Sequence, residues 1–347
     1  MNAVKTSTFD ATPDSMRGRG KHVDRMRAMR SALPALVLWL MASVVAAQDI
    51  YPLKPIRIVV GFQPGSSSDV AARIVAQKLG PVIGQNVVVE NRPGASSGIA
   101  ARAVAAAPPD GHVLFFATVA NVINTAANSP TDIDIARDLL PVALVGRVPN
   151  ILVLNPGLGI DNLEAFIRRV KFRPGEIAYG TAGNGTALHM AAALFSVMAD
   201  VRLLHVPYQG SAAAITDLLA GRISVMFAPA SSVLPYVRSG RLTAIASTGS
   251  TRSSIAPELP TLSELGLRGF ESTVWFGITA PPGLPARAES ILVSAIREAV
   301  GSPEVQAQFK SNGIETSILN LGDFGAFIRR ETDKWAQVIE SQGIRLY

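Results

Sequence analysis

Short loops rich in glycine and serine stand between strand-like and helix-like segments at several places in this chain. Three of them are residues 64–69 (PGSSSD), 94–98 (GASSG) and 183–186 (GNGT), and residues 207–211 (PYQGS) hold the same kind of position. A helix N-terminus leaves backbone N–H groups unpaired and carries partial positive charge. Small residues before it let an anion approach the backbone closely. The recurrence predicts a shared site that grips carboxylate or phosphate oxygens without Arg or Lys.

Strand and helix patterns alternate from residue 56 onward at the spacing of βαβ units, which predicts an α/β fold. In parallel sheets, ligands bind beyond the carboxyl ends of the strands, where the four loops are predicted to lie. Asp69 is predicted to cap the helix after the first loop. Residues 118–124 are predicted to form a further ligand-facing loop, and residues 139–156 two strands around a polar turn.

The length of 347 residues favours two globular units. We expect the second to be inserted into the first, with two hinge strands as crossings and the loops facing one cleft. The predicted boundaries are 1–47 for a signal peptide, 48–150 for the first part of domain 1, 151–274 for domain 2, and 275–347 for the rest of domain 1 with the C-terminal helices.

The N-terminal segment resembles an export signal. Residues 33–47 form an apolar run that follows a basic stretch and ends in small residues, which is typical of a cleaved signal peptide and short for a membrane span. Cleavage after Ala47 makes Gln48 the first residue of a periplasmic chain, and the long basic stretch leaves Met26 or Met29 open as the true start. An uncleaved anchor is the alternative interpretation.

Charge and cysteine content exclude several classes of function. Residues 1–47 hold seven Lys or Arg and three Asp, a net of +4, so the remainder keeps only +2 of the total +6. The net charge of the remainder therefore gives no support for nucleic-acid binding. The chain has no Cys, which excludes disulfides, thiolate catalysis and zinc–thiolate sites. No P-loop or metal-ligand spacing is present, so we expect neither a cofactor nor a metal.

A serine hydrolase is the main alternative to a binding protein. The segment GASSG satisfies the G-x-S-x-G pattern of a nucleophile elbow, with Ser96 in the nucleophile position. Asp110 with His189 or His205 supplies the residue types of a triad, although nothing around either His resembles a catalytic loop.

Two histidines and one tryptophan have open roles. His189 follows GNGT at a helix start, where the helix dipole disfavours a charged imidazole. It is either a neutral donor beside a bound carboxylate or a structural residue. We interpret His205 as structural. Trp275 lies on a predicted hinge strand and forms either a cleft wall or core.

Several longer segments, in their order and spacing, resemble the Bug family, the TctC-like extracytoplasmic solute-binding receptors of tripartite tricarboxylate transporters. They include YPLKPIRIVVGFQPGSSSD, VVVENRPGASSGIAA, YGTAGNGTALHMAA and HVPYQGSAAAITDLLAGRISVMFAP, and the resemblance covers residues 51–347. It implies a two-domain Venus flytrap fold of type II that closes on a small carboxylate, held by loop N–H groups, hydroxyls and waters. It also implies a monomer that delivers its ligand to the permease subunits of such a transporter. A sensor partner of a two-component kinase is the alternative role.

The candidate ligand-binding residues come from the loops and from this resemblance. In domain 1 they are Phe62, Pro64, Gly65, Ser66, Ser67, Ser68, Asp69, Ser96, Ser97, Gly98 and Thr118. In domain 2 they are Gly183, Asn184, Gly185, Thr186, His189, Pro207, Tyr208, Gln209, Gly210, Ser211 and Ala228. Many relatives carry Asp in place of Ala228, which disfavours an amino-acid ligand here.

The first two loops depart from the family pattern. Ser66 replaces the second glycine of the usual PGG, and Ser96, Ser97 and Ala100 replace further glycines. These larger residues narrow the predicted cleft and add hydroxyl donors, so the ligand of a relative does not transfer directly.

Overall fold

A computed structural model describes residues 51–128, 133–319 and 321–345, which belong to one compact unit. The predicted signal peptide and its cleavage site lie outside the described residues. The strands are β1 (Ile56–Val60), β2 (Val87–Asn91), β3 (Val113–Thr118), β4 (Leu140–Leu154), β5 (Ala178–Thr181), β6 (Leu204–Pro207), β7 (Val225–Pro229), β8 (Thr243–Ser247), β9 (Thr273–Ala280) and β10 (Glu315–Leu319). The helices are α2 (Ser67–Ile83), α3 (Gly98–Ala105), α4 (Val119–Ala126), α5 (Ile135–Asp138), α6 (Leu163–Phe172), α7 (Ala187–Ala199), α8 (Ser211–Leu219), α9 (Ala230–Arg238), α10 (Ala286–Gly301), α11 (Pro303–Ser311) and α12 (Leu321–Gln342).

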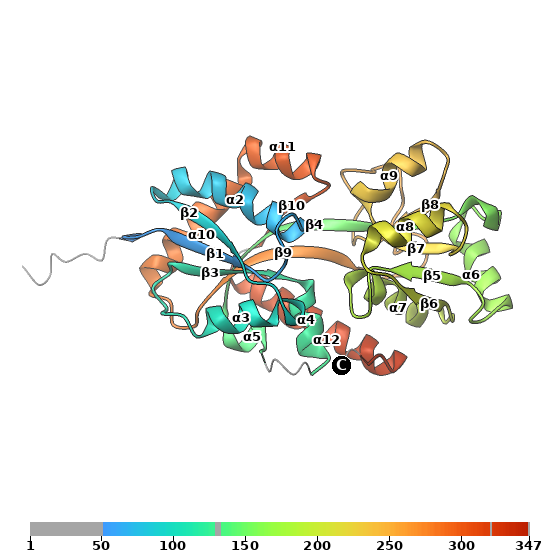
Figure 1. The fold of residues 1–347 in the computed structure, drawn as a ribbon, viewed down its shortest axis with the longest axis horizontal. Helices are drawn as coiled ribbons and strands as arrows, with labels where there is room; N and C mark the ends of the chain where they lie inside the picture. Colours follow the sequence, from blue (N-terminus) through green and yellow to red (C-terminus); the bar gives the residue numbers. More distant parts are fainter. Residues whose placement is uncertain (1–50, 129–132, 320, 346–347) are drawn as a thin grey trace, which may run out of the picture. The chain divides into compact units, whose positions relative to one another are not determined.

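One long strand joins two groups of strands. The sheet order is β2-β1-β3-β9-β4-β7-β5-β6, and β10 and β8 also pair with β4. The first strand group is β1, β2, β3, β9 and β10, and the second is β5, β6, β7 and β8. Strand β4 pairs with β9 over residues 140–149 and with β7 over residues 150–154, so it passes from the first group into the second (Figure 1).

The prediction of two strands over residues 139–156 is wrong, because β4 is one strand of 15 residues. The polar residue Arg147 does not interrupt it. The Arg147 guanidinium lies 5.0 Å from the centre of the Phe327 ring and bonds Glu271 at 2.7 Å, so its charge is accommodated within the strand.

The predicted loop over residues 118–124 is also wrong, because these residues begin α4. Thr118 caps this helix by accepting a hydrogen bond from the Ala120 N–H at 3.2 Å, and the Asn121 side chain accepts from the Thr118 N–H at 2.9 Å. Val122 and Ile123 then bury the apolar face of the helix. Thr118 is itself buried, so its hydroxyl serves the helix cap.

Helix α12 packs against α4, α7 and β4. Trp275 on β9 is fully buried here, so its role is core packing and not a cleft wall. Its indole N–H donates to the buried carboxylate of Glu331 on α12, and the Trp335 indole donates to the same oxygen, both at 3.2 Å. None of the helices within the described ranges has the length and hydrophobicity to cross a membrane.

Candidate functional site

The direction of the strands places the predicted loops at two edges that point toward each other. Strand β9 runs antiparallel to β3 and β4, and β1 and β2 run parallel to β3. In the second group, β7 runs antiparallel to β4, and β5 and β6 follow the direction of β7. The carboxyl ends of β1, β2 and β3 therefore point toward the second group, and those of β5, β6 and β7 point toward the first.

Each strand group has one point where the strand order reverses. In the first group it lies between β1 and β3, and in the second it lies between β5 and β7. Ligands of open α/β sheets bind beyond the carboxyl ends of strands at such points. The loops that follow β1 and β5 border these two points, and they contain the PGSSSD and GNGT segments.

Ser66, and not Asp69, caps the first helix. Ser66 has extended backbone angles, and its hydroxyl accepts a hydrogen bond from the Asp69 N–H at 3.3 Å. The buried Asp69 carboxylate accepts from the Gly65 N–H at 2.9 Å, from Arg73 Nε at 3.0 Å and from Asn91 Nδ2 at 2.8 Å. Burial alone would raise the pKa of Asp69, but these hydrogen bonds outweigh it and hold the pKa below its usual value. Asp69 therefore shapes the first loop as an ionised acceptor.

The first turn of α2 offers two backbone donors. Within the described residues, the N–H groups of Ser67 and Ser68 have no acceptor. The Ser67 side chain is exposed, whereas Ser68 is buried. Pro64 is exposed and Phe62 is half-buried beside them. The loop thus combines free donors with an exposed surface.

The second loop holds three consecutive residues in the left-handed region, Ala95 (φ 46°), Ser96 (φ 47°) and Ser97 (φ 78°). Each such residue costs about 1–2 kcal/mol when it is not glycine. The Asn124 side chain stabilises the turn by donating to the carbonyl oxygens of Ala95 at 3.2 Å and Ser96 at 2.9 Å. Sequence reasoning missed Asn124 because it lies on the helix that was taken for a loop.

Ser97 is fully buried, and its hydroxyl has no partner within the described residues. It fills the space above Gly61, where an added Cβ would lie 1.9 Å from Ser97 Oγ. Gly61 is therefore required by close approach, and Ser97 joins the first loop to the second. Ser96 is exposed and Gly98 is buried at the start of α3.

The GNGT loop ends in a helix cap. The Thr186 hydroxyl accepts from the His189 N–H at 3.4 Å and donates to the Gly183 carbonyl at 2.8 Å. Within the described residues, the N–H groups of Ala187 and Leu188 have no acceptor. The first turn of α7 thus offers two donors, as the first turn of α2 does, and Asn184 is exposed at the tip of the loop.

His189 on α7 is buried, and its Nδ1 accepts the Gly185 N–H at 3.1 Å. Burial, with a smaller contribution from His205, lowers the pKa of His189 to about 4. The imidazole is therefore neutral near pH 7, and its role as a ligand donor or as a structural residue stays a prediction. Its Nδ1 is already used by the loop.

The PYQGS loop begins helix α8 without a side-chain cap. Gly210 precedes the helix, and within the described residues the N–H groups of Ser211 and the two residues after it have no acceptor. The Tyr208 hydroxyl donates to the Asp217 carboxylate at 2.9 Å, and burial together with this bond raises the pKa of Tyr208. Pro207 and Gln209 are exposed.

Ala228 lies in the core and not on a loop surface. It is fully buried on β7 and pairs with Ile151 of β4, so it presents no surface to a ligand in this structure. The turn after β7 continues directly into α9, whose first residues are Ala230, Ser231 and Ser232 and whose N-terminus has no side-chain cap. Sequence reasoning missed this turn, although its APASS segment has the same small, hydroxyl-rich character as the other loops.

The residues proposed for a serine hydrolase do not come together. In the described part of the chain, Ser96 Oγ has no hydrogen-bond partner, His189 Nδ1 bonds Gly185, and His205 Nε2 bonds Thr181. The Asp110 carboxylate pairs with Lys54 at 2.8 Å instead. The described residues also hold no group of three or more His, Asp or Glu side chains that could bind a metal.

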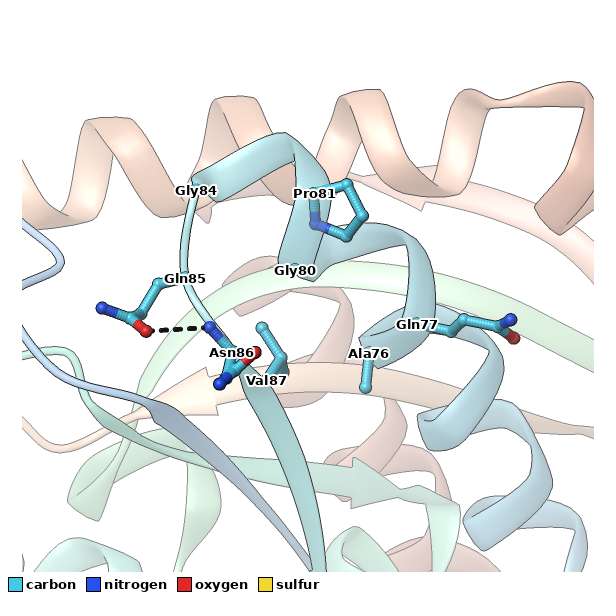
Figure 2. Close-up of a pocket in the computed structure, with 8 residues that line it drawn as sticks. All are labelled: Ala76, Gln77, Gly80, Pro81, Gly84, Gln85, Asn86 and Val87. Carbon is cyan, nitrogen blue, oxygen red and sulfur yellow. Dashed lines mark hydrogen bonds between the residues drawn. The ribbon is translucent and has the colours of Figure 1, made fainter.

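Two surface grooves lie away from the predicted loops. Figure 2 shows a groove of about 500 Å³ at the C-terminal end of α2, opposite to the end that carries the first loop. It is lined by Ala76, Gln77, Gly80, Pro81, Gly84, Gln85, Asn86 and Val87. A second groove of about 570 Å³ touches the C-terminal end of α7 at Ser196 and Val197, whereas GNGT precedes the N-terminal end.

Comparison with known proteins shows a match over most of the described chain. Residues 71–344 match the family described as the tripartite tricarboxylate transporter family receptor, TctC. Protein BugT of Bordetella pertussis is 35% identical over 300 residues, which cover 86% of this chain and 92% of BugT.

Solved structures of similar proteins share the fold. Rpa4515 of Rhodopseudomonas palustris, solved with adipate, is 30% identical, with a TM-score of 0.71 over 85% of this chain and 99% of that chain. MatC of the same organism, solved with bound malate, is 25% identical, with a TM-score of 0.68 over 83% of this chain and all of that chain. These matches confirm the predicted α/β periplasmic-binding-protein fold. The predicted domain boundaries stay a prediction.

Proposed function

The chain belongs to the tripartite tricarboxylate transporter receptor family, a family of solute-binding proteins without enzymatic activity, and we propose that it captures a small organic carboxylate between its two strand groups. The facing carboxyl ends of the strands carry this proposal, because they direct the first turns of α2 and α7 toward the same space. The adipate and malate bound to two relatives supply the ligand class.

Backbone donors would hold the carboxylate. The free N–H groups of Ser67 and Ser68 on one side, and of Ala187 and Leu188 on the other, lie in helix first turns, where the helix dipole favours an anion. A hydrogen bond to a charged group contributes about 1.5–3 kcal/mol. Two pairs of such donors therefore suffice for a specific site.

The arginine that contacts the first loop is already engaged. Arg73 is the basic residue beside it, and its guanidinium is already engaged by the Asp69 carboxylate and by Asn91 Oδ1 at 3.0 Å. Releasing Arg73 to a ligand would leave the buried Asp69 carboxylate without its cationic partner, which is costly. The carboxylate would instead meet amides and hydroxyls.

Ligand capture would shift a conformational equilibrium. Contacts from both strand groups exist together only when the groups approach each other, so the ligand favours the closed form. We propose that a periplasmic monomer in this form delivers its ligand to the permease subunits of a tripartite tricarboxylate transporter, and that the N-terminal signal peptide exports it.

A thermal-shift screen tests the ligand class. The purified protein is heated with adipate, malate, citrate-like and aromatic carboxylates, with amino acids and sugars as controls. A ligand present at 100 times its Kd stabilises the folded state by about 2.7 kcal/mol, which raises Tm by several degrees. A response to sugars alone would contradict the proposal.

A matched pair of variants tests the site. Ser67→Leu places bulk at an exposed position in the first turn of α2, and Ser294→Leu makes the same change at an exposed position of α10. We expect Ser67→Leu to abolish binding with a change in stability of about 0.5 kcal/mol or less, while Ser294→Leu binds normally. Equal binding by both variants would refute the assignment.

A further inference from the structure

Two imidazole rings from different elements stack on one another behind the GNGT loop. The centroids of His189 on α7 and His205 on β6 are 4.1 Å apart, and the ring planes differ by 6°. Tyr179 on β5 stacks on His205 at 4.9 Å. Two charged imidazoles would repel each other strongly at this separation in a buried place. The stack therefore excludes two charged rings, and burial favours the neutral form of each ring by lowering the pKa of both histidines.

His189 holds one peptide of the loop directly. Its Nδ1 accepts the Gly185 N–H at 3.1 Å, so the proton of the neutral ring is on Nε2. Gly185 has φ +69°, a conformation that glycine adopts without steric cost. Because glycine adopts other conformations as readily, a contact is needed to hold this one. The imidazole thus supplies the support that the backbone lacks.

His205 holds a second peptide through one threonine. Its Nε2 lies 2.7 Å from Thr181 Oγ1, and this hydroxyl bonds both the N–H and the carbonyl of Gly183 at 3.2 Å. Gly183 has φ +125°, a backbone conformation that residues with a Cβ rarely adopt. Both glycines of GNGT are therefore fixed by one histidine each, and the stacking couples the two rings.

We propose that His189 and His205 are positioning residues of the carboxylate site, which hold the GNGT loop and the first turn of α7 in the geometry that receives the ligand. This inference rests on the proposed function. It assigns His189 Nδ1 and His205 Nε2 to the loop, since these two nitrogens already bond Gly185 and Thr181.

Two pairs of isosteric variants separate positioning from general packing. The Asn amide oxygen takes the place of Nδ1, and the Gln amide oxygen or nitrogen takes the place of Nε2. His189→Asn therefore keeps the acceptor for Gly185, and His189→Gln loses it. For His205 the order reverses, because Gln keeps the bond to Thr181 and Asn loses it.

Three measurements on the full protein read the result. Nitrogen-15 NMR reports the tautomer of His189 in the wild type, and amide hydrogen exchange reports the protection of Gly183 and Gly185. Titration with adipate reports affinity. We expect Nε2–H for His189, faster exchange in His189→Gln and His205→Asn, and affinity for adipate about 5- to 10-fold weaker in these two, as for the loss of one hydrogen bond. The partner variants should stay within about twofold of the wild type.

Each outcome decides the proposal. A proton on Nδ1 of His189 overturns it, and this result does not depend on how well a variant folds, because the tautomer is read in the wild type. Equal exchange of Gly183 and Gly185 in the Asn and Gln variants also overturns it. If the tautomer and exchange agree with expectation while adipate and the other carboxylates of the screen do not bind, positioning of the loop stands and the proposed ligand class fails. Equal affinity of all variants with altered exchange overturns the link between loop and ligand.

Discussion

Replacing Ser97 with glycine should stabilise this protein, although glycine normally destabilises a folded chain. Ser97 has φ +78° and a buried hydroxyl without a partner in the described residues. Relief of the left-handed conformation raises the free energy of unfolding by about 1–2 kcal/mol, and removal of the unpaired hydroxyl raises it by about 1–3 kcal/mol. The greater entropy of glycine in the unfolded chain costs about 0.5–1 kcal/mol, and the lost contact with Gly61 costs about 0.8 kcal/mol. At the middle of these ranges the net gain is about 2 kcal/mol.

Urea denaturation of Ser97→Ala and Ser97→Gly separates the two terms. Alanine removes the hydroxyl and keeps the positive φ, so its gain reports the hydroxyl alone, and the further gain in glycine reports the backbone. Ser196→Gly is the matched control, because this buried hydroxyl donates to the Ala192 carbonyl at 2.9 Å within α7. It should lose about 1–2 kcal/mol. Destabilisation by Ser97→Gly of the same size as in the control would refute the reasoning.

Three further predictions concern buried polar groups. Glu331→Ala should lower the free energy of unfolding by about 3–5 kcal/mol, because it leaves the buried indole N–H groups of Trp275 and Trp335 without their acceptor. Urea denaturation followed by tryptophan fluorescence measures this loss. Glu340→Ala, at an exposed position of α12, is the control. Asp69→Asn should cost about 2 kcal/mol by removing the charged acceptor of the first loop, and an unchanged urea midpoint would contradict this. Because the pKa of His189 is lowered to about 4 in the folded protein, the unfolded chain binds a proton first as the pH falls. The free energy of unfolding should therefore drop by about 3 kcal/mol from pH 6.5 to pH 4. His189→Asn should remove this drop from the curve of stability against pH.

Much of the fold could be predicted because strands and amphipathic helices leave regular patterns. The order of strands and loops from β1 to β3 and from β5 to β7 follows the sequence closely. The errors occur where tertiary contacts override local pattern. Arg147 reads as a turn residue until Phe327 and Glu271 accommodate its charge, and only the long strand that it occupies explains how β4 joins both groups.

The candidate site was predictable in its loops and not in the contacts that shape them. A hydroxyl-rich segment before a helix is visible in sequence. The contacts that shape it come from elsewhere, since Asn91 on β2 bonds Asp69, and Asn124 on α4 supports residues 95 and 96. Such partners are set by topology and leave no signal at fixed spacing. For the same reason Asp69 looked like a cap, although Ser66 holds the required extended backbone.

A site of this kind reconciles capture with release. A buried arginine–carboxylate pair is costly to break, because separation leaves at least one charge unpaired in a poorly solvated place. Amide donors carry no such penalty when the ligand leaves, since water can replace the ligand oxygens at exposed loop N–H groups. The neutral His189–His205 stack then has a physical reason: a charge there would bind the carboxylate more tightly and also break the loop bond to Gly185. On the proposed site, we expect selectivity to come from the shape of the loops, and Ser66, Ser97 and the two glycines of GNGT to set that shape.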